Sequence, residues 1–240
     1  MLSQLNLGEI LFLDIETVPQ AAGFELLDED WKALWTEKSK FMREKQQIDL
    51  PTSYESAGIY AEFGKIIVIG VGYLTSQYRE KVFRTKVFAG HDEKELLSEF
   101  AAMLERLTND PFRLLCAHNG KEFDFPYLCR RMLVNGIRLP QLLNIAGRKP
   151  WEVAHLDTME LWKFGDYKHY TSLRLLAQMF DIPTPKDDID GSRVREVYWQ
   201  DNDLERIQRY CVKDVVTVAR LLARFTGVND FPDDGEEAGA

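Results

Sequence analysis

Short apolar runs rich in β-branched and aromatic residues recur along the chain, separated by turn residues or by longer amphipathic stretches. Runs of this length and composition are typical of β-strands. They predict four strands and a weaker fifth, at residues 10–14, 65–74, 81–89, 113–118 and 153–157.

The connections between these runs indicate the strand directions. The segment TSQYRE, between the second and third runs, is short enough for an antiparallel pair. The amphipathic stretch 91–107, before the fourth run, suits a crossover helix. We therefore expect an α/β fold in which one mixed sheet is flanked by helices.

A long segment, residues 20–64, separates the first run from the second. It has helical composition from 28 to 44 and a turn-rich part, PTSYESAG, and its few aliphatic residues could hardly form a core alone. We interpret it as a helical insertion in a single domain that spans residues 1–228, and we prefer plain helical packing to a lid over a substrate. The acidic tail, 229–240, carries Pro and Gly without periodicity, and we expect it to be disordered.

The last amphipathic stretch, residues 202–225, predicts a long helix, because its apolar residues recur at steps of three and four along one face. Asn202 and Glu205 have the spacing of an N-terminal capping pair. Tyr210 and Asp214 lie one turn apart at the edge of the apolar face, so we expect them to project together toward the end of a strand.

Composition and charge narrow the functional class. A net charge of -9 over 240 residues argues against a protein that coats nucleic acid through a broad basic surface. No apolar run approaches the roughly 20 residues of a transmembrane helix, and the N-terminus lacks the pattern of a signal peptide, so we expect a cytoplasmic protein. The three cysteines, Cys116, Cys129 and Cys211, form no C-x-x-C pair, and we expect buried reduced thiols.

Carboxylates occur where the apolar elements meet polar sequence. Asp14 and Glu16 close the first run in EILFLDIETVPQ, and Asp214 lies on the last helix. Asp124 follows the fourth run where a helix would begin, a position that also suits a helix N-cap. If these carboxylates converge, their mutual repulsion requires cations between them. Ligands made of oxygen alone favour Mg²⁺ or Mn²⁺ over zinc.

Three motifs in chain order resemble those of the DEDD exonuclease superfamily: DIET matches D-x-E, NGKEFD matches N-x(3)-[FY]-D, and YCVKD matches Y-x(3)-D. The third motif is that of the DEDDy branch, which includes the proofreading domains of family-B DNA polymerases. The DEDDh branch has a histidine at the position of Arg209. The segment YTSLRLLAQMFDIPTPKDDIDGS looks like the predicted bacterial PolB-like exonucleases that stand alone without a polymerase. The resemblance, from Glu9 to Phe225, implies an RNase H-like fold with a mixed five-stranded sheet whose second strand is antiparallel.

The resemblance also implies a 3′-5′ exonuclease that releases 5′-mononucleotides by a two-metal mechanism. Two divalent ions, Mg²⁺ or Mn²⁺, would be held by Asp14, Glu16, Asp124 and Asp214, with Asp14 bridging both. Tyr210 completes the implied catalytic set. Because an unperturbed phenol has a pKa of about 10, we assign Tyr210 to orienting the attacking water rather than to removing its proton.

Substrate contacts are expected inside the motifs. Thr17, Asn119 and Phe123 are the candidates for the terminal nucleotide, although Phe123 suits the core equally well. The segment WKFGDYKHY, residues 162–170, interleaves basic and aromatic residues as single-strand binders do, and a solvated loop explains it equally well. We assign structural roles to His155 and Asp157.

Three functions stay open at this point. The leading hypothesis is an exonuclease that acts on 3′ ends of nucleic acid, single-stranded DNA above all, with a role in DNA repair. An exoribonuclease would use the same site, because the discrimination depends on contacts to a 2′-hydroxyl. The third hypothesis is a nucleic-acid-binding module with an inactive site, and the intact set of carboxylates argues against it.

Overall fold

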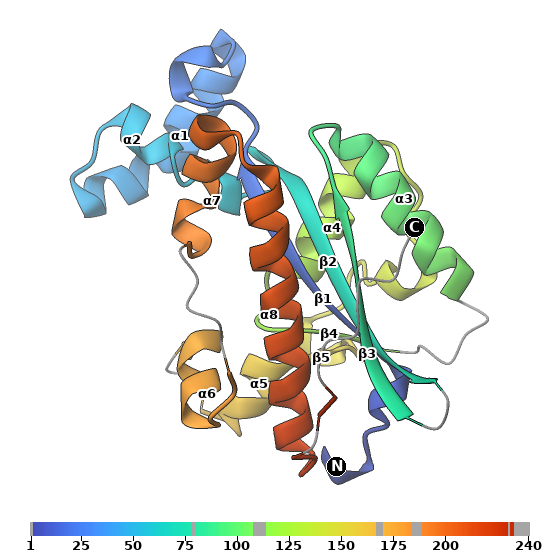
Figure 1. Cartoon of the computed structure of the whole chain (residues 1–240). Coiled ribbons are helices and arrows are strands. Elements are labelled where there is room, and N and C mark those ends of the chain that lie inside the picture. Colours follow the sequence, from blue (N-terminus) through green and yellow to red (C-terminus); the bar gives the residue numbers. More distant parts are fainter. Residues whose placement is uncertain are drawn as a thin grey trace.

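The computed structural model describes residues 2–77, 80–107, 114–166, 170–183, 189–229 and 231–232. Its five strands form one sheet in the order β3-β2-β1-β4-β5 (Figure 1). β1 pairs antiparallel with β2 and parallel with β4, so the predicted mixed sheet with an antiparallel second strand is confirmed. The strands are β1 (Ile10–Pro19), β2 (Gly64–Gln77), β3 (Glu80–Ala89), β4 (Leu114–Ala117) and β5 (Leu156–Asp157).

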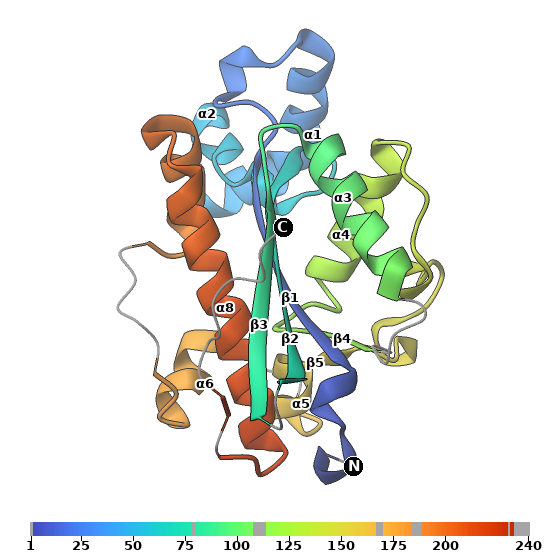
Figure 2. The ribbon, with the colours of Figure 1, turned by 45° about the vertical axis from the view of Figure 1, so that its right-hand side comes forward.

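Helices cover both faces of the sheet. Helix α8 (Leu204–Phe225) lies on one face, and α3 (Glu93–Arg106) and α4 (Asp124–Val134) lie on the other (Figure 2). Two short helices, α5 (Thr158–Lys163) and α6 (Leu173–Met179), pack against α8. The remaining short elements are η1 (Leu2–Gln4), η2 (Leu7–Glu9), η6 (Gln141–Leu143), η7 (Pro150–Glu152), η8 (Gly191–Arg193), α7 (Val194–Glu196) and the π-helix Val197–Asp201.

The alternation of side chains along β1 divides the core between the two faces. The odd-numbered residues of 11–15 pack with α3 and α4, whereas Ile10 and Phe12 pack with α8. Residues two apart on a strand share a face, so Asp14 and Glu16 follow Phe12 onto the α8 side. The strand thus brings two carboxylates under the long helix.

β1 is longer than the sequence predicts. The expected strand ends at Asp14, but β1 stays paired with β2 as far as Pro19. Among the described residues, β4 pairs with β1 from Ile10 to Phe12. A shift of register, typical of a bulge, falls between Glu16 and Thr17 in the pairing of β1 with β2. The prediction that the carboxylates end a strand is therefore wrong: they lie within it, beyond the stretch that β4 covers.

The start of α8 also differs from the prediction. Asp203, not Asn202, is the N-cap, and its carboxylate accepts a hydrogen bond from the Arg206 amide at 3.0 Å. Asn202 has a φ of 52° and follows the π-helix, in the left-handed conformation that asparagine tolerates. The predicted capping pair of Asn202 and Glu205 is therefore wrong by one position.

The segment between β1 and β2 is helical and has a small aromatic core. It contains η3 (Phe24–Leu26), α1 (Glu29–Gln46), α2 (Leu50–Tyr54) and η4 (Ala57–Ile59). Trp35 is fully buried among aromatic rings, and its indole nitrogen donates to Ser53 Oγ at 3.0 Å. The core of the insertion is therefore made mainly of aromatic rather than aliphatic side chains.

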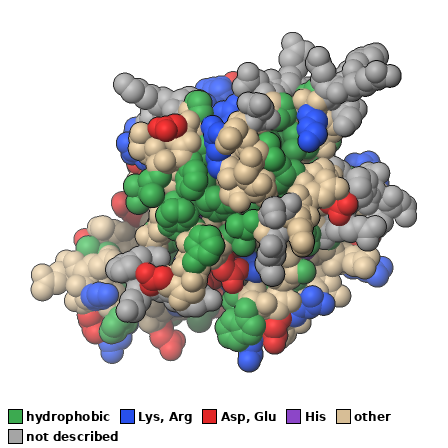
Figure 3. Space-filling model, turned by 90° about the horizontal axis from the view of Figure 1, so that it is seen from below, with side chains coloured by type: hydrophobic (Ala, Val, Ile, Leu, Met, Phe, Trp, Pro, Cys, Tyr) green, Lys and Arg blue, Asp and Glu red, His purple; other side chains and the backbone are tan. Residues whose placement is uncertain are grey.

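Large apolar side chains are exposed at the end of the molecule opposite the helical insertion. Figure 3 shows hydrophobic side chains gathered on the face seen from below. Phe164, Leu175 and Met179, on or next to α5 and α6, are each more than half exposed.

None of the helices in the described part of the chain is long and apolar enough to cross a membrane. Of the expected disordered tail, 229–240, only residues 229, 231 and 232 lie within the described residues.

Candidate active site

Asp14 and Glu16 form the centre of a buried polar cluster between β1 and α8. Glu16 is only 6% exposed, and Asp14 is half-buried. Their carboxylates and the Cys211 thiol each offer a ligand atom within 4.8 Å of the other two. This spacing allows the three groups to contact the same metal ion.

Asp124 reaches the same cluster from the start of α4. It is 3% exposed, and its negative charge acts on both Asp14 and Glu16. The alternative of a helix N-cap is wrong, because Phe123 occupies the N-cap position and Asp124 is the first helical residue. A backbone hydrogen bond at Ile15 ties the Asp124 side chain to β1.

Helix α8 supplies the remaining residues. Tyr210 and Asp214 are hydrogen-bonded to each other through their side chains, and both are half-buried. The charge of Asp214, like that of Asp124, acts on both β1 carboxylates. The structure thus brings together the five residues that the motifs single out as catalytic.

Two glycines of β2 allow α8 to approach the sheet closely. A Cβ on Gly70 would lie 2.9 Å from Cys211 Sγ, and one on Gly72 would meet first the Phe83 ring of β3 and then, at 2.9 Å, a Val215 methyl carbon of α8. Any larger residue would push the helix away from β1. The pair of glycines in IGVGY, an otherwise apolar strand, is the signal in the sequence that could have predicted this close approach.

Loss of hydration dominates the electrostatics of the cluster. Desolvation raises the pKa of Asp14 and that of Glu16 well above their usual range, and the charges of neighbouring carboxylates add to both shifts. Desolvation raises the pKa of Asp124 to about 7. Desolvation, followed by the charge of Asp214, also raises the pKa of Tyr210. Carboxylates with such shifts are matched to divalent cations, which supply the missing positive charge.

The thiol of Cys211 is a member of the cluster that the sequence analysis missed. Its Sγ lies 3.5 Å from both the backbone oxygen and the Oδ2 atom of Asp14. Desolvation and the charge of Asp14 raise its pKa, so the thiol stays protonated and acts as a weak donor. All three cysteines are free, as predicted; Cys116 and Cys211 are buried, and Cys129 is partly exposed.

Asp157 organises the loop that carries Asp124. This residue is 3% exposed, and its carboxylate accepts hydrogen bonds from the amides of Asn119 and Lys121 at 2.9 and 3.1 Å. It also accepts from the amides of Met159 and Glu160 at the start of α5. The structural role predicted for Asp157 is confirmed. His155 is likewise structural, because it accepts from the Leu115 amide and contacts the Leu142 carbonyl.

The expected substrate contacts lie around the cluster. Thr17 follows the bulge, and its side chain is hydrogen-bonded to Tyr127, whose ring packs on that of Phe123. Asn119 has a φ of 62°, and its Oδ1 atom is buried without a partner among the described residues. An acceptor in that state is suited to a donor supplied by a ligand.

The segment 162–170 divides into parts with different roles. Trp162 packs with Phe180 and Phe225 and is therefore structural. Tyr170 is 69% exposed, yet the charge of Asp214 acts on it. Residues 167–169 lie outside the described residues.

Comparison with known proteins identifies the family. Residues 59–233 match the family described as "Predicted 3'-5' exonuclease related to the exonuclease domain of PolB". The chain belongs to this family. The match covers Asp124, Tyr210 and Asp214 but begins after β1, so Asp14 and Glu16 lie outside it and are linked to the site by the DIET motif and by the structure.

Archaeal DNA polymerases are more distant relatives. The chain is 23% identical over 195 residues to a DNA polymerase of Pyrococcus glycovorans, with 74% of this chain and 24% of the relative covered. DNA polymerase 1 of Pyrococcus abyssi is 23% identical over 196 residues, with the same shares covered. The family B DNA polymerase of Pyrobaculum calidifontis has a similar fold, with a TM-score of 0.54, 16% identity, and 90% of this chain and 24% of that chain covered. The chain thus spans about a quarter of these polymerases.

The raised pKa values predict how stability depends on pH. Without metal, the folded protein keeps the Asp124 proton up to about pH 7, whereas the unfolded chain loses it near pH 4. The folded state therefore binds more protons in this window, and its stability falls as the pH rises from 4 to 7. Bound Mn²⁺ replaces the protons, so we expect it to raise Tm by roughly 5 °C more at pH 8 than at pH 6. Thermal denaturation in EDTA and in Mn²⁺ tests this, and an Asp124→Asn variant with the same pH slope in EDTA contradicts it.

Removal of the Asp157 carboxylate, which holds the loop before α4 and whose charge acts on Asp124, should weaken metal binding. Asp157→Ala leaves four amides without their acceptor, so we expect a loss of roughly 3 kcal/mol of stability and displacement of Asp124. Mn²⁺ affinity, measured by calorimetric titration, should fall about tenfold or more. Asp92→Ala is the matched control, because Asp92 caps α3 through two amides and lies outside the cluster. Parental Mn²⁺ affinity in a folded Asp157→Ala variant would refute this positioning role.

Proposed function

We propose that the chain is a metal-dependent 3′-5′ exonuclease that hydrolyses the terminal phosphodiester bond of single-stranded DNA and releases 5′-mononucleotides. The observation that carries the proposal is the convergence of four carboxylates and one tyrosine from β1, α4 and α8 on one desolvated cluster. Membership of the PolB-related exonuclease family supports the same reaction.

The donor set fits two hard divalent cations. The family's ligand positions fall on Asp14, Glu16, Asp124 and Asp214, and carboxylate oxygens are the ligands that Mg²⁺ and Mn²⁺ prefer. The charges of the other three carboxylates all act on Asp14, which is our candidate for the bridging ligand. When bound, two such ions stabilise the entering and leaving oxygens of a displacement at phosphorus.

Tyr210 is suited to orienting water. Its raised pKa keeps the phenol protonated at neutral pH, so it cannot serve as the base. Its hydroxyl donates to Asp214, which places it beside a proposed metal ligand. We assign Tyr210 to holding the attacking water in line with the scissile bond.

The terminal nucleotide has three candidate contacts. Asn119 offers its unpartnered Oδ1 atom to a base or sugar donor, Phe123 offers a half-buried ring, and Thr17 lies next to Glu16. The relatives named above are DNA polymerases, which favours DNA over RNA as the substrate.

A product assay tests this function. We expect 5′-labelled single-stranded DNA to be shortened from its 3′ end in Mg²⁺ or Mn²⁺ but not in EDTA, with duplex DNA and RNA degraded more slowly. Asp214→Asn should lower the rate at least about a hundredfold because it removes a proposed metal ligand. Glu205→Gln, on an exposed position of the same helix, is the matched control and should leave the rate unchanged.

The Tyr210 variant separates chemistry from metal binding in the same assay. Tyr210→Phe should lose about tenfold or more in kcat while its Mn²⁺ affinity stays within twofold of the parent.

Intact labelled DNA and RNA under all metal conditions would count against the exonuclease. Faster shortening of RNA than of DNA would instead assign an exoribonuclease.

A further inference from the structure

We propose that the helical insertion forms one wall of a binding track for single-stranded nucleic acid. In this track, Phe41 and Lys45 of α1 contact nucleotides upstream of the 3′ end. The proposal rests on the proposed function, because the strand must end at the carboxylate cluster. It assigns a substrate contact to α1, which lies outside the residues that match the family, 59–233.

Phe41 is an aromatic side chain that α1 holds away from the aromatic core of the insertion. It is 77% exposed, whereas Trp35 and Met42 of the same helix pack inside that core. Leu34, two turns earlier on the same face of α1, is 51% exposed. An exposed ring of this kind offers a platform on which a base stacks, because every base has a π-face.

Unpaired positive charge accompanies this ring. The stretch KSKFMREK, residues 38–45, holds four basic residues and one acidic residue in a chain whose net charge is -9. Lys45 is exposed, lies one turn after Phe41, and has no ion-pair partner among the described residues. The helix dipole favours a lysine near the end of α1 but gives no reason for an exposed phenylalanine beside it. Aromatic rings interleaved with cations are the pattern of single-strand binding.

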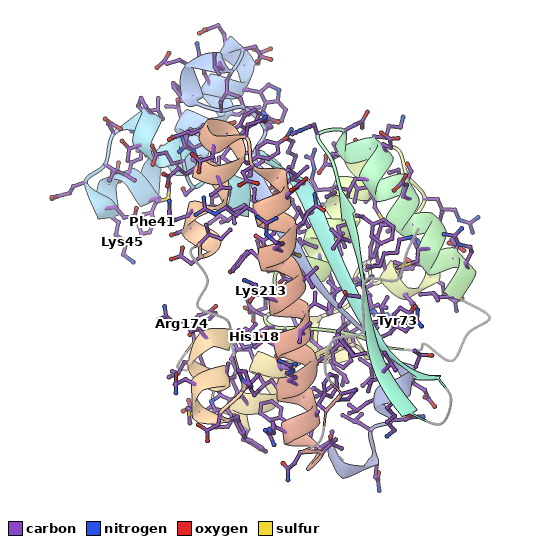
Figure 4. All side chains as sticks on the ribbon, in the orientation of Figure 1. Phe41, Lys45, Tyr73, His118, Arg174 and Lys213 are labelled. Atoms are coloured by element: carbon purple, nitrogen blue, oxygen red, sulfur yellow. The ribbon has the colours of Figure 1, made fainter. Side chains whose placement is uncertain are left out.

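These residues lie on the side of the molecule that carries Lys213 and Arg174 (Figure 4). In Figures 1 and 2 the insertion lies beyond one end of α8, and α6 lies near the other end. Figure 4 shows Phe41 and Lys45 on the edge of the insertion that faces Arg174 of α6, with Lys213 of α8 between them in height. Lys213 is the residue before Asp214. A strand with its 3′ end at the cluster thus has cations on either side and the Phe41 ring along one wall.

The wall is attached firmly to the rest of the fold. Tyr127 Oη donates to the Gly58 carbonyl at 2.7 Å, and Arg131 Nη1 donates to the Ala61 carbonyl at 2.9 Å. At the residue just before the insertion, Trp199 Nε1 donates to the Pro19 carbonyl at 3.3 Å. These bonds hold both ends of the insertion against α4 and the π-helix, so α1 is a fixed surface rather than a free arm.

Binding measured without turnover tests the track. The anisotropy of a fluorescein-labelled 12-nucleotide DNA in EDTA gives the affinity of the full chain. We expect Phe41→Ala with Lys45→Gln to weaken binding at least about tenfold, since one stacked base is worth about 1–3 kcal/mol. The control is Trp151→Ala with Lys149→Gln, which removes an exposed aromatic ring and the lysine 5.2 Å from its centre. It should bind like the parent.

The salt dependence separates the two roles. Lys45→Gln or Arg174→Gln alone should reduce the slope of log K against log salt by about 0.7, the value of one phosphate contact on a single strand, and Phe41→Ala should leave the slope unchanged. Equal affinity and equal slopes in folded variants and parent would overturn the track and favour a protein as the occupant of this face.

A one-nucleotide substrate separates this proposal from the proposed function. The p-nitrophenyl ester of thymidine 5′-monophosphate occupies the cluster without reaching α1, so the variants should hydrolyse it in Mn²⁺ at the parental rate. An equal loss of ester hydrolysis and DNA binding would overturn the track, because it would indicate a disturbed cluster. If the parent hydrolyses neither the ester nor DNA, the proposed exonuclease activity is refuted. The anisotropy comparison would still show whether Phe41 and Lys45 bind single-stranded DNA.

Discussion

The structure around the active site depends on one constraint, which is the mutual repulsion of the clustered carboxylates in a desolvated space. Desolvation and neighbouring charges raise the pKa of Asp14 and of Glu16, and desolvation raises the pKa of Asp124 to about 7. A fold does not gain stability from such a cluster by itself. Divalent cations would neutralise it, and the family of 3′-5′ exonucleases to which the chain belongs uses divalent metal ions.

The scaffold holds the cluster together through features that lie outside the catalytic set. Gly70 and Gly72 let α8 approach β1 closely, and Asp157 fixes the loop that leads into α4. The buried Arg131 guanidinium pairs with Glu93 and donates to the carbonyl of Ala61, which joins α3 and α4 to the insertion. Each of these contacts resists the separation that repulsion between the carboxylates would otherwise favour.

The sequence predicted the parts that depend on local patterns. The apolar runs and the short link between β2 and β3 gave a mixed sheet, and the three motifs gave the family. Local patterns could not show that β1 continues past Asp14, because pairing with β2 extends it to Pro19. They also missed Cys211, whose place beside Asp14 depends on how closely α8 packs. A π-helix precedes α8 and shifts its N-cap to Asp203, and the hydrophobic periodicity of the sequence does not indicate such a π-helix.

The central claim is that four carboxylates hold two metal ions, with Asp14 between them, and a crystal soaked in Mn²⁺ tests it most directly. We predict two anomalous difference peaks about 4 Å apart, both in contact with Asp14, with Asp124 and Asp214 among their ligands. A single peak held by Asp14, Glu16 and Cys211, with Asp124 and Asp214 uncoordinated, would contradict it.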